Sequence, residues 1–505
     1  MKKTVTLLLA LTLVVTIFAT GCGRNERDLE TLVVASMSDA RSLDPHGTND
    51  NASSRVMKQI YNTLMEQQDD LEVDFGLAKD YEMVSETEYR FELHQGVLFH
   101  NGEELTSNDV KFTFERMKEI SPAAFLIDPI DRVEIEDDYN FTIHLKFPFG
   151  PFITHLSHTA TAIVNEKAVL EAGEDFGRNP VGTGPFKFVE WNSGDSIKLE
   201  RFDAYYEGPA ASKYVLFRFI SENTPRAIAL ENNEVDVIYD VGPEDFGNLA
   251  QRDGIVGLQT DGLTTFYLGF NVEKEPFNDV RVRQAINLAL DVDLATEVAF
   301  QGYANTAKGP LSPNVQFANN DIEGYGHDIE EAKRLLAEAG FEDGFSTSIW
   351  TNDNPVRERY AAIFQEQLAQ VGIEVSIETM EFAPYLDRTA LGEHDMFMLG
   401  WVAVTGDADY GLYSLFHSDE FGDAGNRTFY ANPRVDELLD IGKTSPLEED
   451  RAAAYYEVQQ IIFEEAPWVF LAFRDELNAH RDHVEGFNPH MAGHHSLYRV
   501  FNNKQ

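Results

Sequence analysis

An α/β fold with more than one domain is predicted from the length of the chain and from the helical and strand patterns that alternate along its later half. The chain has 505 residues, too many for one hydrophobic core, so two or three domains are expected. Hydrophobic residues make up 43% of the chain and aromatic residues 12%, which is enough to fill well-packed interiors. Helices that alternate with strands indicate an α/β lobe.

Strand patterns dominate the first half of the chain. A strand is predicted at 31–36, and a loop rich in Ser, Asp, Pro and Gly separates it from a helix near 53–65. A second helix is predicted at 106–118, with Thr106 as N-cap and Asp109 in the capping-box position. Alternating apolar and polar residues predict strands, largely antiparallel, at 89–93, 132–135 and 141–145.

The later half alternates helix and strand. One long helix is predicted at 280–300 and another at 328–339, where Glu331 lies in the capping-box position and Gly340 follows the last turn. A helix at 355–371 and a strand at 373–379 complete the pattern.

The charge balance limits the possible partners. The chain has 86 acidic and 40 basic residues, a formal net charge of −46. Nucleic acid and anionic lipid surfaces are therefore improbable direct partners, because both require a basic face. The acidic residues are spread along the chain, which favours an acidic, solvated surface suited to high salt or high pH.

The N-terminus has the pattern of a bacterial secretory signal. Lys2 and Lys3 precede the apolar run LTLVVTIFATG at 11–21, and the only cysteine, Cys22, follows directly. This pattern resembles the lipobox of bacterial lipoproteins, so we expect a signal peptide at 1–21, a lipidated N-terminus and linker at 22–30, and palmitate among the attached acyl chains. We expect a mature protein outside the cytoplasm, anchored to the cell membrane at the cell surface or in the periplasm.

Motifs for catalysis are missing. The sequence contains no GxSxG, HExxH or GxxxxGK[ST] motif, and the glycine-rich VGTGPF at 181–186 lacks the residues of a phosphate-binding loop. Several histidines occur in pairs, but none has further metal ligands at motif spacing. We therefore predict no enzyme activity, no catalytic residues, no metal and no cofactor.

A series of segments occurs in order along nearly the whole mature chain: SLDPHG at 42–47, IYNTL at 60–64, YRFELHQGVLFHNGEELTSNDVKFTFERM at 89–117, NPVGTGPFKFVEW at 179–191, FNDVRVRQAINLALD at 277–291, HDIEEAKRLLAEAG at 327–340 and LAQVGIEVSIE at 368–378. Together these segments resemble the family 5 extracellular solute-binding proteins, the receptors of peptide and nickel ABC importers, most closely the glutathione-type and oligopeptide-type binding lipoproteins.

The resemblance implies a two-lobed, hinged periplasmic-binding-protein-like fold of type II. Lobe I would comprise 31–264, with an additional α+β subdomain at about 56–178, and lobe II would comprise 265–480. Residues 481–505 would return to lobe I, and the crossover strands would lie near 265–270 and 469–474. A ligand that contacts both lobes only in the closed state would drive closure.

The implied function is capture of a peptide or peptide-like solute, of the oligopeptide or glutathione type, and its delivery to the permease of an ABC importer. We expect a monomer tethered by its lipid anchor. A nickel-chelate or haem receptor of the same fold is the alternative, and a secreted hydrolase is a more distant one.

The expected ligand contacts depart from those of dipeptide receptors. In those receptors an Asp three residues after a Trp pairs with the peptide ammonium, but here Val404 holds that place after Trp401. The receptors also hold the peptide carboxylate with an Arg in the strand before the helix at 355–371, where this chain has IWTNDN. The segment WVAVTGDADY at 401–410 resembles the glutathione-type and some oligopeptide-type branches. If the solute carries an ammonium, Asp407 is its expected partner, because it is the nearest carboxylate on the same turn.

The other candidate residues are weighed against structural roles. Trp401 would either stack on the ligand or close the core of lobe II. Thr405 would either offer a hydroxyl to the ligand or belong to a self-bonded polar turn, and Asp409 could be either a contact or a helix cap. Further candidates are Asn426 and Arg427 for a ligand carboxylate, and Asn352, Asp353 and Tyr61 as weaker contacts.

Overall fold

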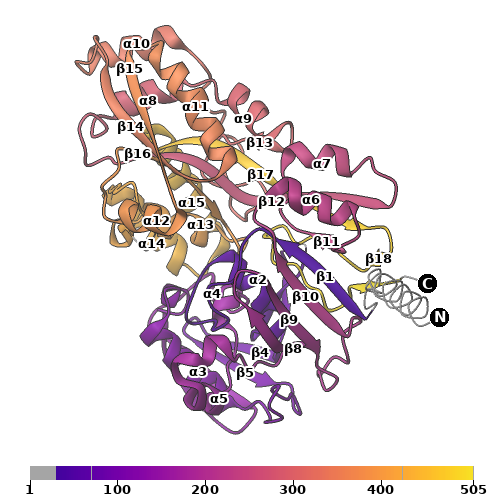
Figure 1. Cartoon of the computed structure of the whole chain (residues 1–505). Coiled ribbons are helices and arrows are strands. Elements are labelled where there is room, and N and C mark those ends of the chain that lie inside the picture. Colours follow the sequence, from indigo (N-terminus) through magenta and orange to yellow (C-terminus); the bar gives the residue numbers. More distant parts are fainter. Residues whose placement is uncertain (1–29, 70, 423–424, 504–505) are drawn as a thin grey trace, which may run out of the picture.

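The computed structural model describes residues 30–69, 71–422 and 425–503. The predictions for the signal peptide, Cys22 and nearly all of the linker lie outside the described residues. Two lobes stand on either side of a pair of long strands, with the later-middle part of the chain in one lobe and the first half in the other (Figure 1). None of the described helices is long and apolar enough to cross a membrane.

One large sheet runs through both lobes. Within the described residues it has eleven strands, in the order β15-β14-β16-β12-β17-β11-β1-β10-β9-β8, with β13 paired to β17. The strands of this sheet are β1 (Thr31–Ser36), β8 (Phe186–Asn192), β9 (Ser196–Arg201), β10 (Tyr214–Phe219), β11 (Val237–Ile238), β12 (Ile255–Phe270), β13 (Ala304–Thr306), β14 (Phe345–Asn352), β15 (Ile373–Met380), β16 (Met396–Val402) and β17 (Trp468–Arg481).

The smaller sheets belong to lobe I. A four-stranded antiparallel sheet, in the order β4-β5-β7-β6, packs beside helix α3 (Ser107–Ile120), within the part of the chain where an α+β subdomain is predicted. These and the remaining small strands are β2 (Met65–Gln67), β3 (Val73–Phe75), β4 (Ala78–Ser85), β5 (Glu88–Leu93), β6 (Ile130–Ile135), β7 (Asn140–Leu145), β18 (Val484–Glu485) and β19 (Phe501–Asn502).

Helices flank the large sheet in both lobes. Those of lobe I, besides α3, are α2 (Asn51–Ile60), α4 (Phe152–His155), α5 (Glu166–Ala172), α6 (Asn223–Glu231) and α7 (Pro243–Leu249). Those of lobe II are α8 (Val280–Ala289), α9 (Val292–Phe300), α10 (Ile329–Glu338), α11 (Pro355–Ala369), α12 (Phe382–Ala390), α13 (Ala408–Phe416), α14 (Pro433–Thr444) and α15 (Glu448–Glu465).

Strands β12 and β17 join the lobes. The first part of β12 pairs with β17 at 476–481, next to β11 of lobe I, and the last part pairs with β17 and with β16 of lobe II. The register shifts between Thr260 and Thr264, and a Cβ on Gly262 would lie 2.2 Å from the Arg474 carbonyl oxygen. Only glycine fits so close to another backbone. The irregularity therefore lies a few residues before the crossover expected near 265–270.

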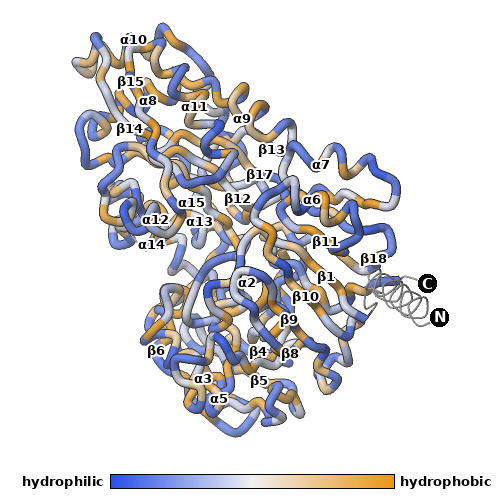
Figure 2. The backbone as a smooth tube through the Cα atoms, in the orientation of Figure 1, coloured by the Kyte–Doolittle hydropathy of each residue, from blue (hydrophilic) through white to orange (hydrophobic). Residues whose placement is uncertain are grey.

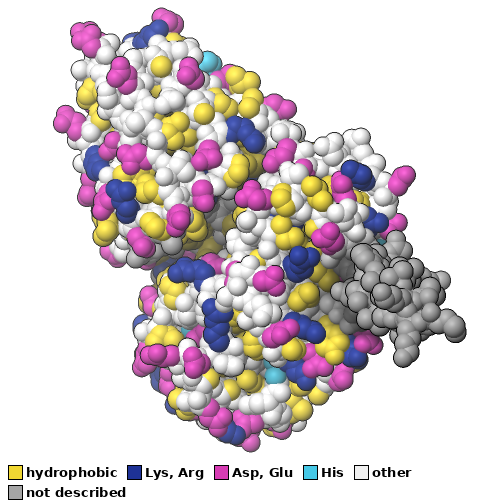
Figure 3. Space-filling model, viewed as in Figure 1, with side chains coloured by type: hydrophobic (Ala, Val, Ile, Leu, Met, Phe, Trp, Pro, Cys, Tyr) yellow, Lys and Arg dark blue, Asp and Glu magenta, His cyan; other side chains and the backbone are white. Residues whose placement is uncertain are grey.

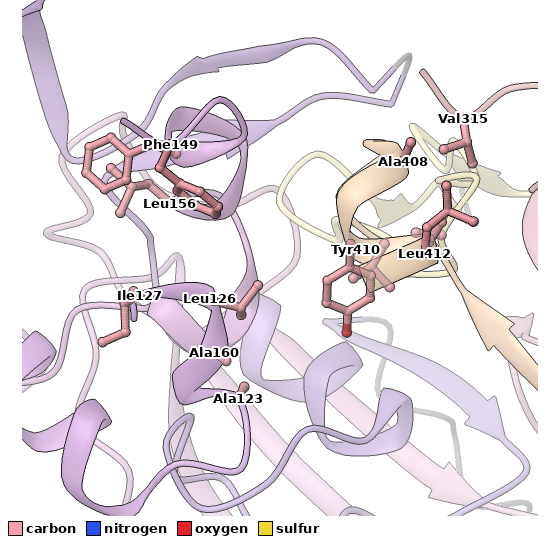
Figure 4. Close-up of a cluster of buried hydrophobic side chains, with 14 of the residues drawn as sticks. Ala123, Leu126, Ile127, Phe149, Leu156, Ala160, Val315, Ala408, Tyr410 and Leu412 are labelled. Atoms are coloured by element: carbon pink, nitrogen blue, oxygen red, sulfur yellow. The ribbon is translucent and has the colours of Figure 1, made fainter. Parts of the chain in front are cut away.

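Hydrophobic residues concentrate on the buried strands, as Figure 2 shows for the strands at the centre of each lobe. One core, under α8, α9 and α11, belongs to lobe II, and another, between α2 and the strands β1 and β9, belongs to lobe I. A third cluster extends across the lobe boundary: Figure 4 shows Leu126, Phe149 and Leu156 from lobe I opposite Tyr410 and Leu412 of lobe II. The two lobes are therefore in contact.

Local signals placed most helix ends correctly. The capping box is present at the start of α3, where the Asp109 carboxylate accepts a hydrogen bond of 3.0 Å from the Thr106 amide. Asp328 caps α10, and Gly340 follows that helix with a φ of +91°. In such a left-handed conformation glycine avoids the strain of a side chain.

Two helix predictions were wrong in their limits. The helix expected at 280–300 is two helices, because Leu290 adopts an extended conformation and Asp291 caps α9 through the Leu294 amide. The helix expected near 53–65 begins at Asn51 and ends at Ile60, since Asp50 caps it and Tyr61 is extended. Residues Met65–Gln67 form the short strand β2 instead.

Candidate functional site

The candidate site lies where the lobes face each other across the ends of the lobe II strands. β14, β15 and β16 end at this edge, and β12 enters lobe II there at Thr264. In open α/β sheets, ligands bind outside the carboxyl ends of the strands. The space-filling surface is hollowed along the line between the lobes (Figure 3).

Hydrogen bonds join the two lobes beside this cleft. Gln67 Nε2 of lobe I donates to the Thr405 carbonyl oxygen over 2.8 Å, and the Gly150 amide donates to the Lys443 carbonyl oxygen over 2.9 Å. The ring of Tyr410 lies 5.6 Å from the ring of His158 and 5.9 Å from that of Phe125. The loop after β16, the start of α13 and the end of α14 thus all lie against lobe I.

Trp401 and Thr405 both lie at this wall of the cleft. Trp401 is half-buried near the end of β16, and its Nε1 donates to the Tyr410 carbonyl oxygen over 3.0 Å. Its ring lies 5.4 Å from the Tyr410 ring. The Thr405 hydroxyl accepts from the Asp407 amide, so it stabilises the turn, and only its carbonyl oxygen reaches lobe I.

Asp407 has a different partner from the one expected. Both of its carboxylate oxygens lie 2.8 Å from Arg451 Nη2 on α15, and the residue is only 2% exposed. It also caps α13 by accepting a hydrogen bond from the Asp409 amide. In this structure Asp407 thus pairs with Arg451 and caps α13, and its expected role as the ammonium partner of a ligand stays a prediction.

Asp409 connects the lobes. Its Oδ2 lies 3.5 Å from His155 Nε2 of lobe I, and its Oδ1 accepts a hydrogen bond from the Tyr455 hydroxyl. Burial raises the pKa of Asp409 to about 6, an effect that Lys443 opposes and Asp407 adds to. Burial lowers the pKa of His155 to about 4. Asp407, and not Asp409, caps α13, and Asp409 instead forms a contact between the two lobes.

Three further candidates, Asn426, Arg427 and Tyr61, make hydrogen bonds to other residues of their own lobe. The Asn426 amide donates to the carbonyl oxygens of His417 and Tyr430 and is fully buried. Arg427 Nη1 donates to the Leu386 carbonyl oxygen and to Thr389 Oγ1 within lobe II. The Tyr61 hydroxyl donates to the Leu43 carbonyl oxygen inside lobe I. These contacts disagree with a direct ligand role for Asn426 and Tyr61.

Asn352 and Asp353 end β14 at the cleft edge. Asp353 is exposed, whereas Asn352 is buried and accepts a hydrogen bond of 2.6 Å from Arg357 Nη1. Arg357 belongs to the first turn of α11 and lies 5.5 Å from the centre of the Phe266 ring. The sequence analysis missed Arg357 because an arginine in the first turn of a helix normally points to solvent.

The hinge strand β17 brings charges to the base of the cleft. Arg474 pairs with Glu476 and lies 3.6 Å from Asp240, which also pairs with Arg55 of α2. Burial opposes ionisation of Asp240, but the Arg55 guanidinium outweighs it and lowers the pKa of that carboxyl. The Arg474 side chain keeps 28% of its surface exposed, more than Asp240 or Glu476. The exposed charge at the base of the cleft is therefore positive.

Two lobes, two continuous joining strands and a cleft between them define a hinged solute-binding protein. The match to the family model "Bacterial extracellular solute-binding proteins, family 5 Middle" covers residues 72–423, so the chain belongs to family 5 of the bacterial extracellular solute-binding proteins. Members of this family are binding proteins of ABC importers.

Relatives and solved structures agree with this assignment. The glutathione-binding protein GsiB of Pectobacterium atrosepticum is 33% identical over 468 residues, which cover 90% of this chain and 91% of that protein. The periplasmic binding protein DppA of Helicobacter pylori, solved with the peptide STSA, has a TM-score of 0.87 at 31% identity and covers 94% of this chain and 98% of its own. The Bacillus subtilis oligopeptide-binding protein AppA, solved with a nonapeptide, has a TM-score of 0.83 at 26% identity and covers 94% and 99%.

Proposed function

We propose that this protein is the receptor of an ABC importer for a peptide or peptide-like solute, either glutathione or a short oligopeptide, and that it acts by binding alone, as a monomer. It captures the solute between its lobes and hands it to the membrane permease. The relatives that bind glutathione and peptides support this class of solute.

The observation that carries the proposal is the position of Trp401 at the end of β16 together with the loop that follows it, residues 403–407, which we call the Trp401 loop. This loop presents a half-buried aromatic ring at the cleft edge, and its next residues bond to Gln67 of the opposite lobe. A loop that forms one wall of the cleft and also contacts the other lobe couples solute binding to closure. A solute that contacts both walls shifts the equilibrium to the closed state.

The candidate residues then divide into two groups. We propose that Trp401, Asn352 and Asp353 contact the solute, because they lie at the ends of lobe II strands. Residues that hold the walls in place are Thr405, Asp407, Asp409, Asn426, Arg427 and Tyr61.

Calorimetric titration tests the proposed solute class. Wild-type protein is titrated with reduced glutathione, with tri- to pentapeptides and with nickel–histidine, and closure is followed by small-angle scattering. We expect saturable binding of glutathione or a peptide together with a smaller radius of gyration. Binding of nickel–histidine alone, or turnover of a bound peptide, would contradict the proposal. Among the described residues no group of three or more His, Cys, Asp or Glu side chains is arranged to hold a metal ion.

We also propose that Cys22 carries the lipid anchor that keeps the receptor at the outer side of the cell membrane. Labelling of cells with a radioactive fatty acid should mark the wild-type protein and not Cys22→Ser, and the variant should leave the membrane fraction because the chain is strongly acidic. Label on Cys22→Ser, or its retention in washed membranes, would contradict the anchor.

A further inference from the structure

The guanidinium of Arg357 has no acidic partner among the described residues. Its Nη1 donates to a neutral amide, Asn352 Oδ1, and its buried Nε has no hydrogen-bond partner there. Burial lowers the pKa of Arg357, and the charged neighbour that affects it is a second guanidinium, Arg474. A buried charge without a partner is costly. With 86 acidic residues in the chain, the missing partner does not reflect a shortage of acids.

The strands beneath Arg357 carry small residues beside the ring of Phe266. Phe266 of β12 lies opposite Gly400 of β16 and Ala472 of β17, so small residues flank its ring on both sides. Residues directly opposite on paired strands share a face of the sheet. A Cβ added at Gly400 would be in ordinary van der Waals contact with Thr264, Thr265 and Phe266, at 3.4 to 3.6 Å, so this position tolerates only a small side chain.

Two further donors share this face. Thr264 lies two residues before Phe266 and directly opposite Arg474, so all three side chains lie on one side of the sheet. The Thr264 hydroxyl is buried and has no partner among the described residues, and the same holds for Arg474 Nε. Arg357 from lobe II and Arg474 from the hinge strand thus lie near the same face of the sheet, which also carries the Thr264 hydroxyl.

We propose that Arg357 and Arg474 bind a carboxylate of the captured solute, with Thr264 as an additional donor. The fork of a guanidinium matches the two oxygens of a carboxylate. The inference rests on the proposed function and specifies it: the solute presents a free carboxyl group at the hinge side of the cleft. This site takes the place of the strand arginine that dipeptide receptors use and this chain lacks, and it lies further along the chain, in α11.

The first experiment pairs a change in the protein with a change in the ligand. Wild type, Arg357→Gln and the control Arg359→Gln are titrated with glutathione and with its glycyl ethyl ester. Arg359 is on the same helix, but its Nη1 donates to the Ala299 carbonyl oxygen. We expect Arg357→Gln to weaken glutathione binding by about 100-fold and Arg359→Gln to change it by less than about threefold.

Non-additivity shows whether the two groups meet. Esterification should cost wild type about as much as the substitution does, and it should cost Arg357→Gln little more. Losses that simply add, or glutathione binding by Arg357→Gln at the wild-type affinity, would overturn the site. Arg357→Lys, which keeps the charge but not the fork, should bind with intermediate affinity and covers the case in which Arg357→Gln does not fold.

A second experiment separates this site from the proposed solute class. Wild type and Arg357→Gln are purified in parallel, and the solute that each carries is identified by native mass spectrometry. Loss of a carboxylated solute from the variant supports the site even if that solute is not a peptide, in which case only the proposed function fails. The site is overturned if the solute of the wild type has no acidic group, or if Arg357→Gln retains that solute fully. It is also overturned if the wild type carries no solute and binds neither glutathione nor peptides.

Discussion

Asp407 and Arg357 are both charged groups at the cleft edge of lobe II, but only one of them has a partner of opposite charge. Both carboxylate oxygens of Asp407 accept hydrogen bonds from Arg451 Nη2, and the carboxylate also accepts one from the Asp409 amide at the start of α13. Arg357 has an amide oxygen and an unused Nε. Asp407, whose charge is paired within the protein, holds the wall of the cleft, whereas the guanidinium of Arg357 has no carboxylate partner among the described residues.

The paired charge has a consequence for binding. Arg451 ties the loop after β16 to α15, and its Nε also donates to the Gly442 carbonyl oxygen of α14. The loop that carries Trp401 towards lobe I is therefore held in place before a solute arrives. Preorganised walls reduce the conformational cost of binding.

The largest expected effect comes from removing the paired charge. Asp407→Asn leaves the Arg451 guanidinium, which is 8% exposed, buried without a carboxylate. Loss of one partner of a buried pair costs roughly 3 to 5 kcal/mol of the free energy of unfolding. Urea unfolding of wild type and Asp407→Asn measures this loss. The matched control is Asp419→Asn, since the Asp419 side chain is 84% exposed.

An ammonium anchor predicts the reverse result. If Asp407 held the amine of the solute, Asp407→Asn would fold with nearly wild-type stability and would lose affinity for amine-bearing ligands selectively. N-acetylated and free peptides titrated against both proteins distinguish the two cases.

A smaller effect is expected at Trp401. Its Nε1 is already satisfied by the Tyr410 carbonyl oxygen, so its remaining contribution is the half-buried ring. Trp401→Ala should weaken solute binding by about 2 kcal/mol, roughly 30-fold, whereas Trp401→Phe should lose less because it keeps a ring. Calorimetry with the solute that wild type binds measures both. Trp191→Ala, on β8 of lobe I, should leave the affinity unchanged, and an equal loss there would show that the effect is general.

Much of the fold followed from local signals, and the exceptions have local causes. Asp109, Asp328 and Gly340 mark helix ends that the structure confirms, since caps act through neighbouring backbone groups. The break at Leu290 was missed because the apolar pattern continues through it, and only the cap at Asp291 reveals a second helix. A continuous pattern can thus conceal a short interruption.

The site was less predictable because its contacts are distant in sequence. Asp407 looked available until the fold placed Arg451 beside it, 44 residues later. Arg357 was not among the predicted site residues, since only the folded chain brings it close to Phe266 and Arg474. Motifs such as WVAVTGDADY locate the loop, but which of its charges are satisfied depends on α15, which local patterns do not encode.

The smallest expected effect concerns the link between Asp409 and His155, where the comparison of satisfied and unsatisfied charges becomes a question of pH. The pKa of Asp409 rises from 3.8 to about 6 in the folded protein, chiefly through burial. Its contribution to stability is therefore complete below pH 3.8 and is lost as the pH rises through about 6. His155 acts in the opposite sense, because burial lowers its pKa from 6.5 to about 4, so its neutral form favours the fold increasingly as the pH rises.

Substitution separates the two contributions. Wild type loses stability as Asp409 ionises, and Asp409→Asn cannot ionise at this position. The free energy of unfolding of Asp409→Asn, relative to wild type, should therefore increase by about 1 kcal/mol between pH 5 and pH 7. His155→Gln should shift in the opposite direction, by about 1 to 2 kcal/mol, over the same interval. Urea unfolding of the three proteins at both pH values measures each difference, and His144→Gln, whose ring is near the exposed Glu134, is the control. A difference between Asp409→Asn and wild type that does not change with pH would mean that Asp409 is already solvated, because only a buried carboxyl couples its ionisation to the closed contact with lobe I.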